Sequence, residues 1–523
     1  MLILSELENG DQLQQQLVKS GYKILRRHKL SYGNLFVVNQ SEKADLQSLK
    51  SKFSKLIIER NNIIEFEKFQ EPLDIENFKS ESLFSKQWGL HNTGKNTPIQ
   101  DGYPAPRAGV AKVDTRALSA WDITTGLGDI IIAVMDTGVD IHHPDLIENV
   151  FINTLEKNGV AGVDDDGNGI IDDINGYDFA DNDNNVADFM GHGTHVAGII
   201  GAAHNSFGTM GIMGQVKILP LKIFKDSNIL NREAVVRALD YAVNLGAVVA
   251  ANSWGGGTPS EIIKNAIRQA GERNLLFVAS AGNNKNNNDR ERKYPAGYNL
   301  ENIISVASHN HRDELSYFSN YGKNTVDLLA PGHFILSTFP GNKYKVWSGT
   351  SMAAPHVSGA IGLLLNHVGN MSFKEIKTRL LETTTPSFNY FEKTKSMGRL
   401  NLYNLLENIR PDRGLPKDRE WLDYQLASPI NFVPLAKNMN KVFQWKIPGA
   451  KFIRVVIKDF DLRRDNFANI RDPKQWSEFH LIEGIGERFY SKYIKSDEIG
   501  IRITSGRSSR GKIVIEKLQY IKE

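Results

Sequence analysis

Ser351 stands in a setting that suits nucleophilic catalysis. It lies in the segment 349–357, where a small glycine-containing turn runs into an apolar segment with helical character. A serine at the positive end of a helix has backbone N–H groups nearby that can stabilise a developing negative charge. Taken alone, such a serine is more often a helix cap than a nucleophile.

Two other segments supply the groups that a serine nucleophile needs. Asp136 follows the apolar run 130–135, which predicts a buried parallel strand that delivers a carboxylate at its C-terminal edge. His192 opens a helix rich in small residues in the segment 191–198. A serine hydroxyl needs a general base, and the base needs a carboxylate to fix its tautomer. These segments predict a catalytic set in the order Asp136, His192, Ser351.

The three segments together resemble those of the subtilisin-like (subtilase) serine peptidases. The order Asp, His, Ser is that of subtilisin, among three unrelated orders for the same geometry. The resemblance covers residues 80 to 410. It implies an α/β fold with a doubly wound, mostly parallel sheet. It also implies a serine endopeptidase in which Ser351 attacks the peptide carbonyl, His192 carries the proton and Asp136 orients His192.

The resemblance also assigns the groups around the scissile bond. Asn283 ends the strand-like segment 275–283 and matches the family's oxyanion donor, with an ordinary turn asparagine as the alternative. An extended substrate would pair as a strand between two edges, mainly through its backbone. The residues placed along these edges and in the walls of the primary specificity pocket are Asn228, Ile229, Leu230, Ser253, Trp254, Gly255, Ser280, Ala281 and Gly282.

Lys293 departs from the small residues that are common in the family near the floor of this pocket. We therefore advance the hypothesis that the pocket favours an acidic or polar residue at the cleavage site. The alternative is that the lysine stem extends out to solvent and leaves the pocket unaffected.

Two loops carry oxygen ligands that suit structural Ca²⁺. Asp145 and the loop 203–209 resemble the family's strong calcium site, whose ligands here would be Asp145, Ala203, Asn205, Phe207, Thr209 and, from the N-terminal arm, Glu81. A second, weaker candidate lies in an insertion between Asp136 and His192, and the alternative there is an acidic surface turn. Its ligands at calcium-loop positions would be Asp164, Asp166, Asn168, Ile170 and Asp172.

Composition narrows the classes of partner. The chain has 523 residues, more than one ordinary core, so two or three domains are expected. Its 63 basic and 60 acidic residues argue against nucleic-acid or membrane attraction, and it contains no cysteine. No run of 18 apolar residues is present, so no membrane span is expected. We expect a monomer.

The regions outside residues 79–410 suggest two further domains. Residues 1–78 alternate helix-like and strand-like pieces and resemble the small α+β inhibitory prodomains of the family, with a plain accessory domain as the alternative. Residues 411–418 read as a linker. Period-2 segments dominate 419–523, which resembles a CUB-type β-sandwich without its usual disulfides. A stabilising appendage is an equally good interpretation of this last region.

These observations predict a serine endopeptidase of protein or peptide substrates, made as a precursor that cleaves itself and is inhibited by its own prodomain. We expect a secreted or periplasmic protein whose signal peptide is not in this sequence, with a cytoplasmic location left open. Two alternatives remain: a latent peptidase that acts mainly as a peptide- or matrix-binding protein, and an intracellular processing peptidase.

Overall fold

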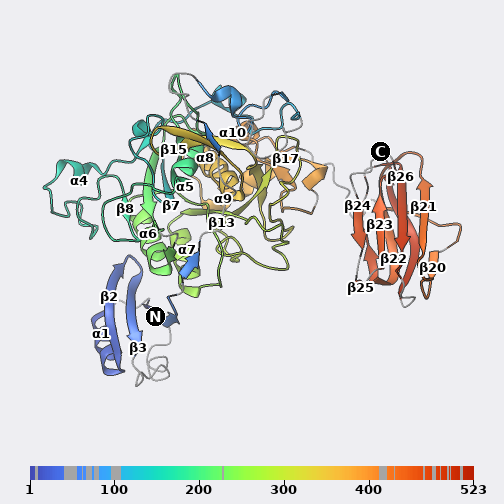
Figure 1. Cartoon of the computed structure of the whole chain (residues 1–523), viewed down its shortest axis with the longest axis horizontal. Helices are drawn as coiled ribbons and strands as arrows, with labels where there is room; N and C mark the ends of the chain where they lie inside the picture. The colour runs from blue at the N-terminus through green and yellow to red at the C-terminus, as the bar shows by residue number, and fades with distance from the viewer. Residues whose placement is uncertain are drawn as a thin grey trace. The chain divides into compact units, whose positions relative to one another are not determined.

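A computed structural model gives the structure of the chain (Figure 1). It forms two compact units, Met1–Asp412 and Arg413–Glu523, and each is described by itself. The structure describes residues 1–5, 10–40, 56–61, 63–65, 73–75, 82–95, 108–226, 229–390, 392–411, 421–428, 430–462, 466–473, 479–482, 484–491, 494, 496–506 and 511–522. Among these residues, no helix combines the length and apolarity that crossing a bilayer requires.

The first unit is built around a nine-stranded sheet of order β17-β18-β14-β13-β12-β11-β7-β9-β8. All neighbouring strands are parallel except β17 and β18. The strand order reverses at β7, since β9 follows it on one side and β11 on the other; open α/β sheets place their sites at such a point. The strands are β7 (Ile131–Asp136), β8 (Tyr177–Asp178), β9 (Lys217–Lys222), β11 (Val249–Asn252), β12 (Leu276–Ser280), β13 (Ile303–His309), β14 (Leu328–Pro331), β17 (Thr385–Pro386) and β18 (Gly398–Arg399).

Helices cover both faces of this sheet, so every central strand is buried and apolar, as parallel strands usually are. α6 and α7 pack on one face, and α5, α8 and α9 on the other. The predicted doubly wound α/β fold is confirmed. The helices are α3 (Ala117–Trp121), α4 (Thr154–Asn158), α5 (His192–Gly201), α6 (Arg232–Asn244), α7 (Glu261–Glu272), α8 (Thr350–Val368), α9 (Phe373–Glu382) and α10 (Leu402–Glu407), with short 3₁₀ turns at Phe84–Lys86, Ile147–Asn149 and Phe388–Tyr390.

The N-terminal region forms a four-stranded antiparallel sheet of order β2-β3-β1-β4, with α1 packed on it. This is the α+β arrangement predicted for residues 1–78, of which residues 41–55 lie outside the described residues. The first strand was not predicted, yet its leucine and isoleucine side chains are fully buried. The elements are β1 (Leu2–Ser5), α1 (Gly10–Lys19), β2 (Tyr22–Leu30), β3 (Gly33–Gln40) and β4 (Leu56–Glu59).

Two short strands follow and pair with strands of the region 108–411. β5 (Ile63–Glu65) pairs antiparallel with β10 (Ile229–Asn231). β6 (Leu73–Ile75) pairs antiparallel with β16 (Lys343–Trp347), which forms a hairpin with β15 (Ile335–Phe339). Segments far apart in the sequence therefore share two small sheets.

The second unit consists of antiparallel strands in two sheets that share one apolar core. This agrees with a β-rich C-terminal region; the CUB likeness and the boundaries 1–78, 79–410, 411–418 and 419–523 stay predictions. The strands are β19 (Leu422–Tyr424), β20 (Ile430–Phe432), β21 (Asn440–Lys446), β22 (Ala450–Leu462), β23 (Phe467–Arg471), β24 (Phe479–Ile482), β25 (Gly484–Tyr490), β26 (Glu498–Thr504) and β27 (Lys512–Lys522).

Candidate active site

Asp136 and His192 form a buried pair at the carboxyl edge of the sheet. Asp136 is the last residue of β7, and His192 is the first residue of α5. His192 Nδ1 lies 2.6 Å from Asp136 Oδ1, and the two side chains are 2% and 0% exposed. A carboxylate at this distance fixes Nδ1 as the protonated nitrogen and leaves Nε2 as the basic one.

A second buried carboxylate positions the loops that carry this pair. Asp188 accepts hydrogen bonds from the Thr137 hydroxyl at 2.9 Å and from the Thr194 backbone and hydroxyl at 2.9 and 2.7 Å. It also accepts from the Gly191 backbone at 2.8 Å. Burial raises the pKa of Asp188, and these donors oppose that rise. Because Thr137 follows Asp136 and Gly191 precedes His192, Asp188 ties the segments that carry Asp136 and His192 together.

Ser351 is held by a reciprocal pair of bonds to the end of β11. Its Oγ donates to the Ser253 carbonyl at 2.8 Å, and Ser253 Oγ donates to the Ser351 carbonyl at 2.8 Å. The second bond is possible because Pro355, four residues further along α8, has no N–H for that carbonyl. Ser351 is the second residue of α8, so it lies at the positive end of the helix.

Asn283 is tied to the first residue of α8 by two hydrogen bonds. Asn283 Oδ1 accepts from the Thr350 backbone N–H and hydroxyl, each at 2.9 Å. This turns the amide nitrogen away from Thr350. Both Asn283 Nδ2 and the Ser351 N lie within 3.7 Å of the point that a Cβ on Gly349 would occupy, so two nitrogen atoms that can donate hydrogen bonds lie near the turn before Ser351.

The walls of the predicted specificity pocket come together at two glycines. Gly282 has φ of +105°, and a Cβ there would clash with the amide of Asn320. On the other wall, the Gly256 N–H donates to the Tyr294 carbonyl at 2.9 Å. Lys293 Cγ lies 3.5 Å from the Cβ position of Gly282, so its half-buried stem runs beside this wall. Ser280 and Ala281 are buried at the end of β12.

The residues predicted to line the substrate edges lie only partly where a substrate could reach them. Ile229 and Leu230 lie in β10, where β5 pairs with them, whereas Asn228 lies outside the described residues. Trp254 is buried, and its ring lies 6.3 Å from that of Phe224 in the core. Its side chain therefore belongs to the core, and only its backbone is left for a substrate.

The loop 203–209 wraps Asp145, and the calcium site expected there stays a prediction. Asp145 is fully buried and accepts from the Thr209 backbone at 2.8 Å, the Thr209 hydroxyl at 3.2 Å and the Asn205 amide at 3.2 Å. Burial raises the pKa of Asp145, and a hydrogen bond from Tyr344 partly offsets the rise. Both carboxylate oxygens of Asp145 thus accept hydrogen bonds. Ala203 and Phe207 lie in the wrapping loop, while Glu81 lies outside the described residues.

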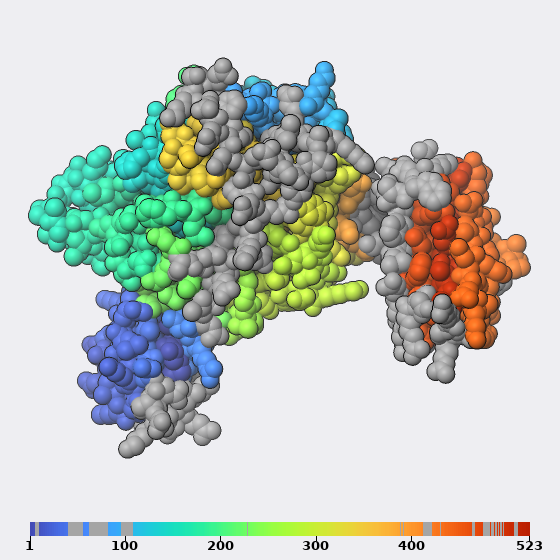
Figure 2. All heavy atoms as spheres, viewed as in Figure 1, coloured from blue at the N-terminus to red at the C-terminus, as the bar shows by residue number. Residues whose placement is uncertain are grey.

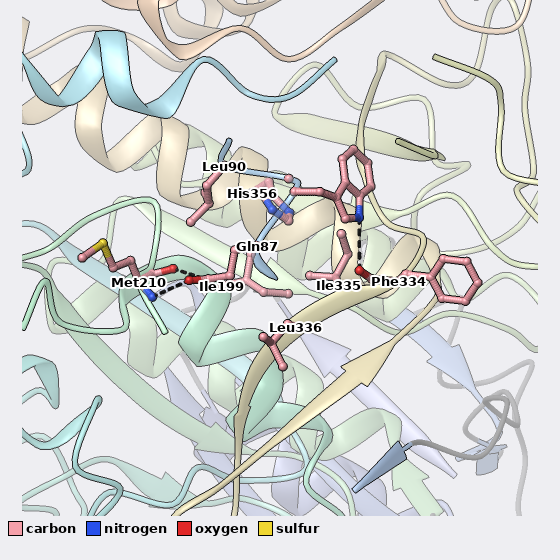
Figure 3. A pocket seen from close by; sticks show the side chains of 10 residues that line it. Gln87, Leu90, Ile199, Met210, Phe334, Ile335, Leu336 and His356 are labelled. Carbon is pink, nitrogen blue, oxygen red and sulfur yellow. Dashed lines mark hydrogen bonds between the residues drawn. The ribbon is translucent and has the colours of Figure 1, made fainter. Parts of the chain in front are cut away.

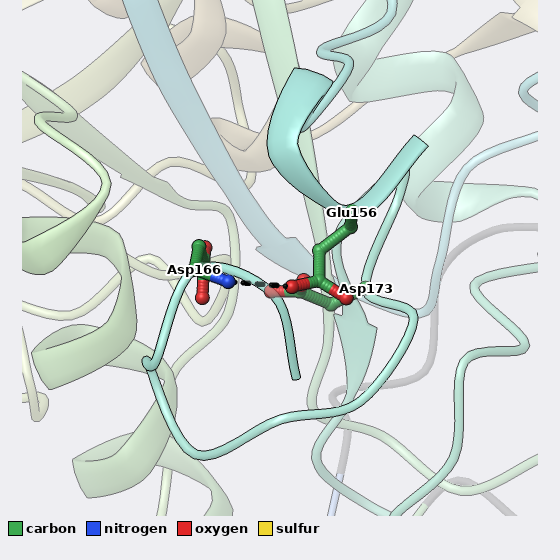
Figure 4. Close-up of side chains that lie close together, drawn as sticks. All are labelled: Glu156, Asp166 and Asp173. Carbon is green, nitrogen blue, oxygen red and sulfur yellow. Dashed lines mark hydrogen bonds between the residues drawn. The ribbon is translucent and has the colours of Figure 1, made fainter. Parts of the chain in front are cut away.

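The acidic insertion brings a different set of carboxylates together from the one predicted. Glu156, Asp166 and Asp173 each offer an oxygen, and these oxygens lie within 4.8 Å of one another (Figure 4). Burial raises the pKa of Asp173, and the neighbouring carboxylates add to the rise. The other predicted ligands close turns: Asp164 accepts from the backbone of Asn168 and Gly169, Asp172 accepts from Gly162, and Ile170 donates to the Asn168 side chain.

Only Asp166 belongs to both the predicted set and this cluster. The sequence could not identify Glu156, because it precedes the acidic run by several residues and reaches it only through the fold. Three clustered carboxylates, two of them buried, form a donor set that suits a hard divalent cation. α4 and this insertion lie at the outer surface of the first unit (Figure 2).

A small cavity of about 10 Å³ is lined by none of Asp136, His192 and Ser351 (Figure 3). Gln87, Ile199, Ile335 and the fully buried His356 are among its lining residues. Its volume is about that of one water molecule, too small for a peptide substrate.

Comparison with known proteins identifies the family. Residues 128–404, more than half of the chain, match the subtilase family model for peptidase S8. The chain is 33% identical over 362 residues to a thermophilic serine proteinase of Bacillus sp. (strain AK1), covering 69% of this chain and 79% of that protein. It is 35% identical over 312 residues to thermitase of Thermoactinomyces vulgaris, covering 60% and 99%.

The major intracellular serine protease of Bacillus subtilis (strain 168) is 36% identical over 266 residues, covering 49% of this chain and 76% of that protein. The match spans β7 through α10, the part of the fold that carries the buried Asp136–His192 pair and Ser351. The chain belongs to the subtilase family and is a subtilisin-like serine peptidase.

Proposed function

We propose that this peptidase is an endopeptidase that uses Asp136, His192 and Ser351 as its catalytic triad and Asn283 as an oxyanion donor. The observation that carries the proposal is the 2.6 Å contact between His192 Nδ1 and Asp136 Oδ1 in a buried site, with His192 and Ser351 each at the start of a helix. The two helices, α5 and α8, pack side by side (Figure 1).

The reaction follows from these positions. The Ser351 hydroxyl leaves the Ser253 carbonyl and passes its proton to His192 Nε2 as Oγ attacks the substrate carbonyl. The new oxyanion accepts hydrogen bonds from the Ser351 N–H and the Asn283 amide. His192 then protonates the leaving amine, and water hydrolyses the acyl-enzyme by the same steps in reverse order. Asp136 stabilises the imidazolium without taking its proton.

We further propose that residues 1–78 are an inhibitory prodomain. Its sheet presents Arg26 and His28 to the buried Glu233 of α6, with Arg26 bonds of 2.9 and 2.8 Å and a His28 contact of 2.7 Å. Glu59 forms an ion pair of 3.0 Å with Arg232 and accepts from the first N–H of α7 at 3.1 Å. Its carboxylate thereby sits at a helix N-terminus, where negative charge is stabilised.

The strand pairing narrows the expected site of self-cleavage. β5 pairs with β10 on one side of the site, and β6 pairs with β16, the strand that leads into Ser351. The stretch that joins them, residues 66–72, is the one that we expect to be cut. The sequence alone predicts a cut between about Phe69 and Glu81.

Comparing wild-type protein with Ser351→Ala tests the proposed function. Wild-type protein should release residues 1 to about 70 and react with a fluorophosphonate at Ser351, whereas Ser351→Ala should stay intact and unlabelled. The same cut in both proteins would show that another protease makes it, and would reject self-cleavage.

We also propose that the cluster of Glu156, Asp166 and Asp173 holds a structural Ca²⁺. The close approach of three carboxylates is unfavourable without a cation, and burial of two of them adds to the cost. The side-chain amides of Asn153 and Asn168 also face these carboxylates. Their oxygens would complete the shell if the amides turned over.

Lys293 remains a proposed specificity residue. The position of its stem beside Gly282 supports a preference for an acidic residue immediately before the scissile bond. A peptide library with all residues at that position decides between this preference and the alternative: no enrichment of Asp or Glu would reject the proposal.

A further inference from the structure

β16, the strand that precedes Ser351, pairs with a strand that the sequence did not predict. β16 pairs with β15 along one edge and with β6 along the other. In the second pair Val346 lies opposite Leu73, Lys345 opposite Asp74 and Tyr344 opposite Ile75. β6 therefore covers the edge of a strand that ends four residues before Ser351.

β16 is anchored directly to the catalytic centre. The ring of Trp347, its last residue, lies 5.9 Å from the His192 ring. The Lys345 carbonyl lies 3.0 Å from Nε2 of His195, in the same helix as His192. An extended segment bonded to this edge is thus held in fixed register beside the reacting groups.

One continuous stretch of chain occupies the strand edges on both sides of the site. β5 lies on β10, the edge expected to hold the residues before the scissile bond, and β6 lies on β16 only seven residues later. Substrate that follows the scissile bond would run in the same direction as β6. The position of β6 on β16 thereby indicates where the part of a substrate after the scissile bond would bind.

The exposed residues of β16 give this edge a charge. Lys343 is exposed and Lys345 half-buried, whereas the alternating residues Tyr344 and Val346 are buried. Lys345 Nζ lies 3.9 Å from the centre of the Phe339 ring, which holds the ammonium group at the sheet surface. Opposite charges at facing positions of antiparallel strands stabilise the pair, and the residue that faces Lys345 is Asp74.

We propose that this edge of β16 binds the segment of a substrate that follows the scissile bond, that β6 is its intramolecular occupant, and that Lys345 makes it prefer an acidic residue at the facing position. The inference rests on the proposed function and adds a class of substrate to it: extended segments with Asp or Glu a few residues after the cut.

The proposal has a consequence for the processed enzyme. A cut within residues 66–72 ends the released prodomain before residue 78, the boundary expected from the sequence. It leaves β6 attached to the catalytic region, because β6 follows the cut. A tethered strand stays at high effective concentration, so an external substrate must displace β6 to use the edge.

A charge swap on the precursor tests the facing pair. Asp74→Lys and Lys345→Glu should each slow self-cleavage by about fivefold, the upper range for a facing charge pair. The double variant should recover to within about twofold of wild type. The matched control, Lys217→Glu, changes an exposed lysine at the far end of β9 and should not rescue Asp74→Lys. Failure of the swap to rescue would overturn the proposal.

A second readout does not need catalysis, so it separates this proposal from the proposed function. In the Ser351→Ala precursor, hydrogen–deuterium exchange of the amides in 343–347 should accelerate in Asp74→Lys and slow again in the swap. Unchanged exchange in every variant would overturn the proposed pairing of Asp74 with Lys345. If the exchange rates change as expected but the precursor with Ser351 intact never cleaves itself, only the proposed function is overturned.

Synthetic peptides test the preference for external substrates. With Asp or Lys placed at successive positions after the cut, the ratio of kcat/KM for Asp over Lys should exceed one at a single position. This ratio should invert in Lys345→Glu and stay unchanged in Lys217→Glu. A flat ratio at all positions would contradict the assignment.

Discussion

Thr350 should control catalysis through the orientation of Asn283. Its hydroxyl donates to Asn283 Oδ1 at 2.9 Å and accepts from the Gly282 N–H at 3.1 Å. Thr350→Val removes both bonds while keeping the shape of the fully buried side chain. Asn283 then keeps one tether, the Thr350 backbone N–H.

The size of the effect follows from these bonds. A neutral hydrogen bond contributes about 1 kcal/mol, so a looser Asn283 should lower kcat by about fivefold to tenfold. This is well below the loss of about 10²–10³ that follows removal of the oxyanion donor itself in subtilisin, a relative in this family. KM should stay near the wild-type value, because the amide acts only once the oxyanion forms. The unpaired Gly282 N–H should also lower the free energy of unfolding by about 1–3 kcal/mol.

Steady-state kinetics on a chromogenic peptide measures this, with Thr350→Ser as the control that restores the hydroxyl. In an Asn283→Ala background, Thr350→Val should add little, since the two changes remove the same function. An unchanged kcat in Thr350→Val, or a full additional loss in the Asn283→Ala background, would refute the idea that Thr350 acts through Asn283.

Three further predictions concern pH, oxidation and metal. Burial lowers the pKa of His195 and His309 to about 3 and of His333 and His356 to about 4. The unfolded chain therefore binds more protons than the folded chain below about pH 6.5. The free energy of unfolding, measured with urea on Ser351→Ala, should fall by about 1.4 kcal/mol per pH unit for each of these histidines as the pH drops below that value. His309→Gln should reduce this slope. Met352 is fully buried with its Sδ 3.6 Å from the Cβ position of Gly349, so peroxide should lower activity without unfolding the protein, and Met352→Leu should resist; full activity after measured oxidation of Met352 would contradict this. Adding Ca²⁺ after chelation should raise Tm in wild type but not in Asp166→Asn. An equal rise in both proteins would contradict calcium binding at this cluster.

The family and the α/β fold could be predicted from the sequence because their signals are local. The apolar run before Asp136 and the small-residue helix starts at His192 and Ser351 each carry their own pattern. The strand predicted from the apolar run 130–135 appears as β7, and the strand-like segment 275–283 contains β12. Buried parallel strands and long helices are periodic over enough residues to be read directly.

What could not be predicted depends on partners that are distant in the sequence. β6 has only three residues and exists because β16 offers an edge. The bonds between Ser253 and Ser351 require the missing N–H of Pro355 and the approach of β11 to α8. The acidic cluster differs from the predicted loop because Glu156 arrives from a separate helix. Tertiary contacts decide such details, and local propensity does not contain them.

The central claim is that Ser351 is the nucleophile, activated by His192 and Asp136. Intact-mass and peptide mass spectrometry after treatment with a fluorophosphonate measures it most directly in the processed wild-type protein. We predict one adduct, located on Ser351, that forms far more slowly in His192→Ala and is absent in Ser351→Ala. An active enzyme that carries no adduct on Ser351, or carries it on another residue, would contradict the account.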